Sequence, residues 1–132
     1  MRKKVLIAAT SLALLGTAVE AHHSAAMFDQ AKVVTLSGTV KEFQWTQPHG
    51  WVVLAVAPTT GGPSEWRVET GAPTQMIKMG IEKNDLPVGA KVVLRIHPLR
   101  DGRPAGAMID GTKADGSPLV KNQMGPPPTT PH

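Results

Sequence analysis

The histidines are the side chains of this sequence best suited to metal chemistry, because the chain contains no cysteine. They are His22, His23, His49, His97 and His132. Without thiolates, a metal ion must be held by nitrogen, oxygen or thioether ligands. The methionines that could supply a thioether to Cu(I) are Met27, Met76, Met79 and Met108. Met76 and Met79 stand three residues apart, a spacing that also suits packing of one helix face.

The adjacent pair His22-His23 is informative because of the segment before it. Met1–Ala21 has a basic start, an apolar middle from Val5 to Leu15 and a small-residue end at Val19-Glu20-Ala21, which are the three parts of a secretory signal. The segment is too short to span a membrane and no second apolar segment follows, so we expect cleavage and no stable membrane anchor afterwards. The mature protein, periplasmic or secreted, then begins at His22.

A histidine at the N-terminus presents its α-amine and its imidazole to one metal ion. A further imidazole completes a T-shaped set of three nitrogens, the histidine brace, and tetragonal nitrogen coordination favours Cu(II). The α-amine must lose its proton to bind, so affinity should fall as the pH drops. The alternative is that His22 and His23 are polar residues on an unstructured arm that binds metal weakly.

Either His49 or His97 could complete such a site. In a five-stranded OB-like barrel, the expected strand Ala90–Pro98 pairs antiparallel with the expected strand Val33–Thr46. The end of Ala90–Pro98 then lies at the start of Val33–Thr46, where the N-terminal arm enters, and His97 lies there. His49 lies at the other end of Val33–Thr46, about 40 Å away if that strand is straight. We therefore expect that His49 and His97 do not easily share one ion. The alternative for each is a surface residue at a strand end.

Other residues suggest different chemistry. Three tryptophans could form a ligand face for a glycan, a peptide or an envelope protein, or could belong to the core: Trp45, Trp51 and Trp66. Glu65 and Glu69 flank Arg67 in a pattern typical of a solvated charge ladder. Ser24 beside His23 has no third member for a catalytic triad. We assign no catalytic residues, and the enzyme class is disfavoured.

Charge argues against nucleic acid as a partner. The formal net charge is +4, and removal of Arg2, Lys3, Lys4 and Glu20 with the signal lowers it to +2. A near-neutral protein with mixed charges has no basic stripe for a phosphate backbone.

The elements expected after the signal are mainly strands. Glycine and proline are frequent, at 13 and 12 residues, which disfavours a helical bundle. The expected strands are Val33–Thr46, bent near Gly38–Glu42, His49–Ala57, Glu65–Thr70, Ala90–Pro98 and Ala105–Asp110, and the expected helix is Thr74–Met79, ended by Gly80. Three strands, a short helix and two strands predict a five-stranded OB-like barrel. An immunoglobulin-like sandwich needs about seven strands.

This gives a single domain over residues 22–122 with an N-terminal arm. The segment 123–132 is proline-rich, and we expect a disordered tail there.

Several segments resemble one family of small exported bacterial proteins, catalogued as domain of unknown function 6152. They are Ala21-His22-His23-Ser24, Phe28-Asp29, Leu36-x-Gly-x-Val40, Trp45-Thr46-Gln47-Pro48-His49-x-Trp51 and Ile96-His97-Pro98-Leu99-Arg100-Asp101-Gly102. The resemblance covers Ala21 to Gly111. It marks His22, His23, His49 and His97 as histidine positions of the family and implies no activity. Gln47 stands where the family usually has Asn, which removes an Asx turn there.

The sequence thus predicts a small exported binding protein that holds copper through an N-terminal histidine brace, with a role in carriage or buffering. The competing prediction is a metal-free interaction module that uses a tryptophan-bearing barrel face. A copper oxidase similar to the polysaccharide monooxygenases is disfavoured, because the axial aromatic residue of those enzymes has no clear counterpart among Phe28 and Phe43 and the chain has no tyrosine.

Overall fold

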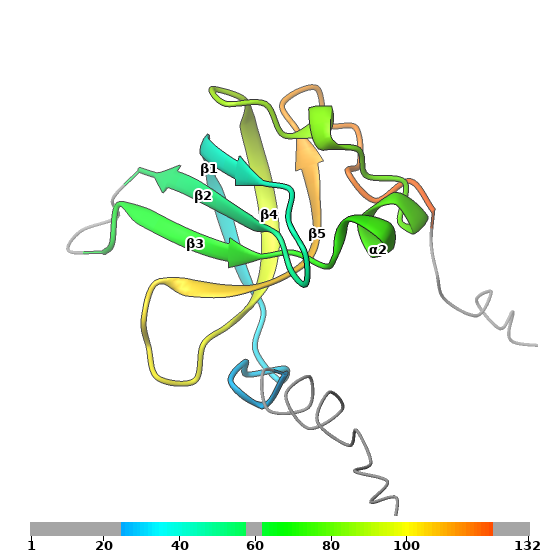
Figure 1. The fold of residues 1–132 in the computed structure, drawn as a ribbon. Coiled ribbons are helices and arrows are strands. Elements are labelled where there is room, and N and C mark those ends of the chain that lie inside the picture. The colour runs from blue at the N-terminus through cyan, green and yellow to red at the C-terminus, as the bar shows by residue number, and fades with distance from the viewer. Residues whose placement is uncertain (1–24, 58–61, 123–132) are drawn as a thin grey trace, which may run out of the picture.

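The computed structural model describes residues 25–57 and 62–122. Five strands and two short helical segments follow the N-terminal arm, residues 25–33 (Figure 1). They are β1 (Val34–Gln44), β2 (Trp51–Val56), β3 (Glu65–Glu69), α2 (Pro73–Lys78), the 3-10 helix η1 (Lys83–Asp85), β4 (Lys91–Pro98) and β5 (Ala105–Lys113). The predicted signal, His22, His23, the loop 58–61 and the tail 123–132 lie outside the described residues.

The strands close into a barrel in the order β1-β2-β3-β5-β4, and β4 pairs with β1. All neighbours are antiparallel except β3 and β5, which are parallel. The helix α2 lies between β3 and β4 in the chain. The predicted five-stranded OB-like barrel is therefore confirmed.

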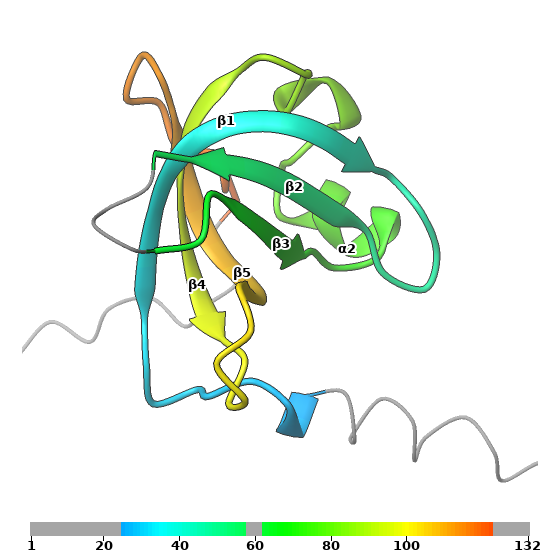
Figure 2. The same cartoon turned by 90° about the vertical axis from the view of Figure 1, so that its left-hand side faces the viewer.

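The first strand bends enough to serve two neighbours. Residues 34–39 pair with β4 and residues 38–44 pair with β2, and the register shifts between Val40 and Glu42. Lys41 is the extra residue of this bulge. The shift changes which parity faces inward, so Val40 before it and Phe43 after it both contact the core. Figure 2 shows the resulting long curve of β1 across the barrel.

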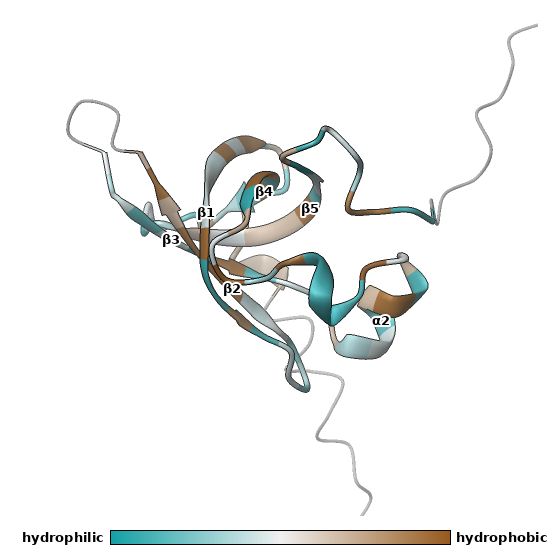
Figure 3. Ribbon diagram, turned by 90° about the horizontal axis from the view of Figure 1, so that it is seen from above, coloured by the Kyte–Doolittle hydropathy of each residue, from teal (hydrophilic) through white to brown (hydrophobic). Residues whose placement is uncertain are grey.

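Alternating apolar residues of the strands fill the barrel. Val52, Leu54, Val68, Leu94 and Ile96 have no exposed surface, and hydrophobic and hydrophilic bands alternate along the ribbon (Figure 3). Burial of one such side chain contributes roughly 1.5–3 kcal/mol.

The helix α2 contributes Met76 to the same core and ends as predicted. Gly80 has φ 78°, a left-handed conformation that favours glycine. The N–H of Gly80 donates to the Ile77 carbonyl and that of Ile81 to the Met76 carbonyl, both at 2.9 Å, which is the Schellman pattern.

The last strand is longer than predicted. β5 continues to Lys113, with Gly111 opposite Leu94, so the predicted end of this strand at Asp110 is wrong. Close packing requires glycine at position 111, because an added Cβ would lie 2.7 Å from Leu94 Cδ2. Its carbonyl accepts a hydrogen bond from Leu119, whose buried side chain joins the core.

No helix in the described part of the chain is long and apolar enough to cross a membrane.

Candidate metal centre

A hollow of about 260 Å³ lies where the pairing between β3 and β5 ends. The last pair of these parallel strands is Glu69 with Ala107, after which the chain turns through Gly71 into α2 while β5 continues. We call this hollow the histidine pocket. Its lining includes Phe28, His49, Glu69, Gln75, His97 and Met108. Six separate parts of the sequence thus meet around one small space.

His49 reaches the pocket because the β2–β3 hairpin ladder continues past its strands. Thr70 donates its N–H to the Gly50 carbonyl at 2.9 Å, and Thr46 Oγ1 donates to the His49 carbonyl at 3.0 Å. These bonds hold the His49 backbone beside the end of β3. The His49 ring lies with Nδ1 2.8 Å from Glu69 Oε1.

His97 reaches the pocket from the end of β4. It stands opposite Ala107 of β5, and its Nδ1 lies 2.8 Å from the Lys32 carbonyl oxygen. A carbonyl only accepts hydrogen bonds, so Nδ1 carries the proton and donates. As predicted, β1 and β4 pair so that His97 lies where the N-terminal arm enters the barrel.

The two histidines are held through the same ring nitrogen, Nδ1. An ionised Glu69 also only accepts, so Nδ1 of His49 carries its proton as well. In both neutral rings the lone pair is then on Nε2. A metal-binding histidine is typically oriented by such a hydrogen bond from its second nitrogen to a carboxylate or a carbonyl.

His49 and His97 line one hollow, although they lie near opposite ends of β1. Ala107 of β5 is paired with Glu69 on one side and with His97 on the other, so one strand separates His97 from Glu69, the partner of His49. Two strand spacings are about 10 Å. Ala107 lines the same pocket as the two histidines.

Glu69 is a site residue that the sequence pattern did not reveal. Its side chain is only 12% exposed, so the interpretation as part of a solvated ladder is wrong. Burial raises the pKa of the Glu69 carboxyl, and the neighbouring His49 opposes that shift. Glu65 is the solvated member, 2.8 Å from Lys41. The register of the hairpin, which sets Glu69 opposite Trp51 and so close to His49, is the signal that could have identified it.

The N-terminal arm is attached beside the same pocket. Asp29 donates its N–H to the Pro98 carbonyl at 2.8 Å, and Arg100 donates its N–H to the Met27 carbonyl at 2.9 Å. Phe28 is buried, and Figures 1 and 2 show this segment beneath the end of β4. Ala25, the first described residue, lines the pocket. His22 and His23 lie outside the described residues, three and two positions before it, respectively.

Within residues 25–57 and 62–122, no group of three or more histidine, cysteine, aspartate or glutamate side chains is arranged to hold a metal ion. What the described chain brings to the pocket is two imidazoles and a carboxylate that orients one of them.

The tryptophans do not share one face. Trp45 and Trp66 pack against the core, and Trp45 meets Phe43 edge to face with ring centroids 5.6 Å apart. Trp51 faces outward, with the Arg67 guanidinium 4.4 Å above its ring. A platform built from all three is therefore not formed.

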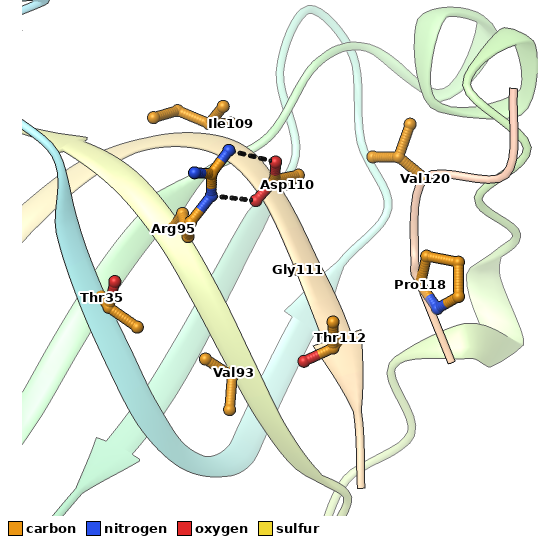
Figure 4. A pocket seen from close by; sticks show the side chains of 9 residues that line it. All are labelled: Thr35, Val93, Arg95, Ile109, Asp110, Gly111, Thr112, Pro118 and Val120. Carbon is orange, nitrogen blue, oxygen red and sulfur yellow. Dashed lines mark hydrogen bonds and ion pairs between the residues drawn. The ribbon is translucent and has the colours of Figure 1, made fainter. Parts of the chain in front are cut away.

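A second hollow lies on the outer side of β1, β4 and β5 (Figure 4). Its charged residues are Arg95 and Asp110, which form two hydrogen bonds with each other at 2.7 and 2.6 Å. Because each already satisfies the other, this pair does not call for a ligand.

Comparison with known proteins identifies the family of this chain. The model of a family of unknown function, DUF6152, matches residues 9–108. The chain belongs to that family. This confirms the resemblance seen in the sequence and assigns no activity. Neither a curated protein nor a solved structure matches the chain.

Proposed function

We propose that this protein is a small exported copper-binding protein that holds the ion in the histidine pocket. The observation that carries the proposal is that His49 and His97, distant in sequence, line one hollow with Nδ1 of each engaged by an oxygen. Two preoriented Nε2 atoms are suitable ligands for copper.

The ligand set is completed by His22 and His23. A chain extends at most about 3.3–3.6 Å per residue, so His23 can lie up to about 7 Å and His22 up to about 10 Å from Ala25. Both distances are sufficient for imidazoles at the edge of the pocket. With the signal removed, the His22 α-amine and imidazole would form the brace, and His23, His49 and His97 would complete the site.

We propose carriage or buffering as the role. The pocket is shallow enough that the His49 side chain remains 42% exposed, which leaves a route by which an ion can enter and leave. Nitrogen ligands in a tetragonal set select Cu(II) among the common divalent ions.

The competing metal-free module has less support, because two of its three tryptophans are packed on the core. Trp51 remains as its outward residue. That function predicts loss of partner capture in Trp51→Ala with unchanged, weak copper affinity in the histidine variants.

The test uses the untagged mature protein beginning at His22. Calorimetry and EPR should show tight Cu(II) binding that is lost when one alanine is added before His22. His49→Ala and His97→Ala should each weaken binding by on the order of tenfold or more, because each removes a ligand. His132→Ala is the matched control and should bind as the wild type does. Equal affinity in all these variants would overturn the proposal.

A further inference from the structure

Arg67 lies exposed on the outer face of β3, with its guanidinium carbon over the Trp51 ring, 4.4 Å from the ring centroid. Arg67 is paired with Val53 and Trp51 with Glu69, so the contact runs diagonally between β3 and β2. A cation–π contact of this kind fixes the position of the guanidinium. It involves no lone-pair acceptor, so the N–H donors of Arg67 need partners elsewhere.

The neighbours of Arg67 on this face do not supply such acceptors. Its cross-strand partners are Val53 and Ala105, whose side chains accept no hydrogen bond. Along β3 the two nearest carboxylates are already engaged, because Glu65 lies 2.8 Å from a lysine and Glu69 lies 2.8 Å from a histidine. Arg67 is therefore an oriented cation beside carboxylates that other cations hold.

The other arginines of the described chain are paired. Arg95, Arg100 and Arg103 each lie within 4.0 Å of an aspartate oxygen. Among residues 25–57 and 62–122, by contrast, no side chain or carbonyl forms a hydrogen bond or a salt bridge with the Arg67 guanidinium. Its donors are available to a ligand.

The Trp51–Arg67 pair stands beside the histidine pocket. Glu69, which lines that pocket, is two residues beyond Arg67 on the same strand face, about 7 Å along the strand. Trp51 is opposite Glu69 and two residues after His49. A ligand held by Arg67 would thus lie next to the proposed copper site without occupying it.

We propose that the Trp51–Arg67 pair binds a carboxylate of a small organic acid that brings Cu(II) to the histidine pocket as its complex. This inference rests on the proposed function and names the form in which the ion arrives. A planar carboxylate matches the fork of a guanidinium and accepts two parallel hydrogen bonds from it. Imidazole nitrogen suits copper better than carboxylate oxygen does, so the ion would pass from the acid to the histidines as Cu(II) throughout.

The first experiment titrates citrate into the copper-free mature protein and follows the Arg67 Nε–H and Trp51 Nε1–H resonances by NMR. Both should shift and saturate. Arg67→Lys keeps the charge but loses the planar fork, so citrate affinity should fall by on the order of tenfold. Arg95→Lys is the matched control, because Asp110 already accepts two hydrogen bonds from Arg95, and it should bind citrate as the wild type does.

The second experiment measures by stopped flow how fast Cu(II) quenches the tryptophan fluorescence of the mature protein. With Cu(II) supplied as its citrate complex, Arg67→Lys should take up the ion more slowly than the wild type by on the order of tenfold. With Cu(II) supplied as the aqua ion, the two rates should agree within about twofold, because the charge is kept and no carboxylate takes part.

Unshifted Arg67 and Trp51 resonances at high citrate would overturn this inference, and so would equal rates of uptake from the citrate complex in wild type and Arg67→Lys. Tight Cu(II) binding, and with it the proposed function, would stand in both cases. Absence of tight Cu(II) binding in the wild type would instead overturn the proposed function and the delivery step together. Citrate-dependent shifts at Arg67 would then still support the carboxylate site.

Discussion

His97 Nδ1 donates a hydrogen bond to the carbonyl oxygen of Lys32 at 2.8 Å, across 65 positions of the sequence. The bond ties the end of β4 to the N-terminal arm just before β1. It has a second effect, because it fixes the ring with Nε2 free of that contact. One interaction thus serves both the attachment of the arm and the orientation of a proposed ligand.

These two effects can be separated with paired variants. In His97→Asn, the side-chain amide can still donate to Lys32, but the ligand nitrogen is gone. In His97→Ala both are lost. We expect both variants to lose Cu(II) affinity by on the order of tenfold or more. Only His97→Ala should also lose about 1 kcal/mol of unfolding free energy in urea denaturation, the net contribution of a typical hydrogen bond. Full Cu(II) affinity in His97→Asn would contradict the role of Nε2.

Glu69→Gln tests the carboxylate that orients His49. The amide keeps the shape of the side chain but accepts a hydrogen bond less strongly, and it removes the charge that makes the imidazole a better donor to metal. We expect Cu(II) affinity to fall by about 10-fold or more in calorimetry, the lower end of the range for residues that orient a ligand. Glu65→Gln, on the same strand and ion-paired with Lys41, is the control and should leave affinity unchanged. A Glu69→Gln protein with wild-type affinity would show that His49 needs no such partner.

The barrel itself was predictable because its elements have local signals. Alternating apolar residues marked β3 and β4, the change of phase marked the bulge at Lys41, and Gly80 marked the end of α2. The end of β5 was predicted wrongly at Asp110 because Gly111 follows it. Glycine occurs in turns but also where another side chain must pack closely, and sequence alone does not distinguish the two uses.

The candidate site was only partly predictable, because it is formed across the barrel. The chemistry of histidine identified the candidate residues. The contact between His49 and Glu69, however, depends on the register of a hairpin, and the approach of His97 depends on the pairing of Ala107 with both Glu69 and His97. Both contacts depend on which residues are paired in neighbouring strands, and the local patterns that predict the strands do not specify those pairs.

Gly50 is expected to be essential to the position of His49. A Cβ added there would lie 2.5 Å from Thr70 Oγ1 and 2.6 Å from the Gln44 carbonyl oxygen, and the latter is backbone that cannot move easily. Gly50→Ala should therefore lose roughly 1–3 kcal/mol of unfolding free energy, the usual cost of overpacking. It should also weaken Cu(II) binding, because the turn that carries His49 must shift. Wild-type stability in urea denaturation would show that the turn relaxes freely.

Asp85 ties η1 to the end of β5 and to the C-terminal segment, and it should govern stability in acid. Burial alone would raise the pKa of its carboxyl, but hydrogen bonds from Lys113, the Glu82 N–H and Lys121 outweigh burial and lower the pKa from 3.8 to about 2. The native state therefore binds its proton less readily than the unfolded chain, so this contribution is complete above pH 3.8 and is lost as the pH falls through about 2. The shift corresponds to about 2 kcal/mol.

Asp85→Asn should lose at least that amount at pH 7 in urea denaturation and should flatten the decline of stability between pH 4 and 2. Asp110→Asn, at the exposed pair with Arg95, should change stability far less. An unchanged acid profile in Asp85→Asn would show that other carboxylates control acid unfolding.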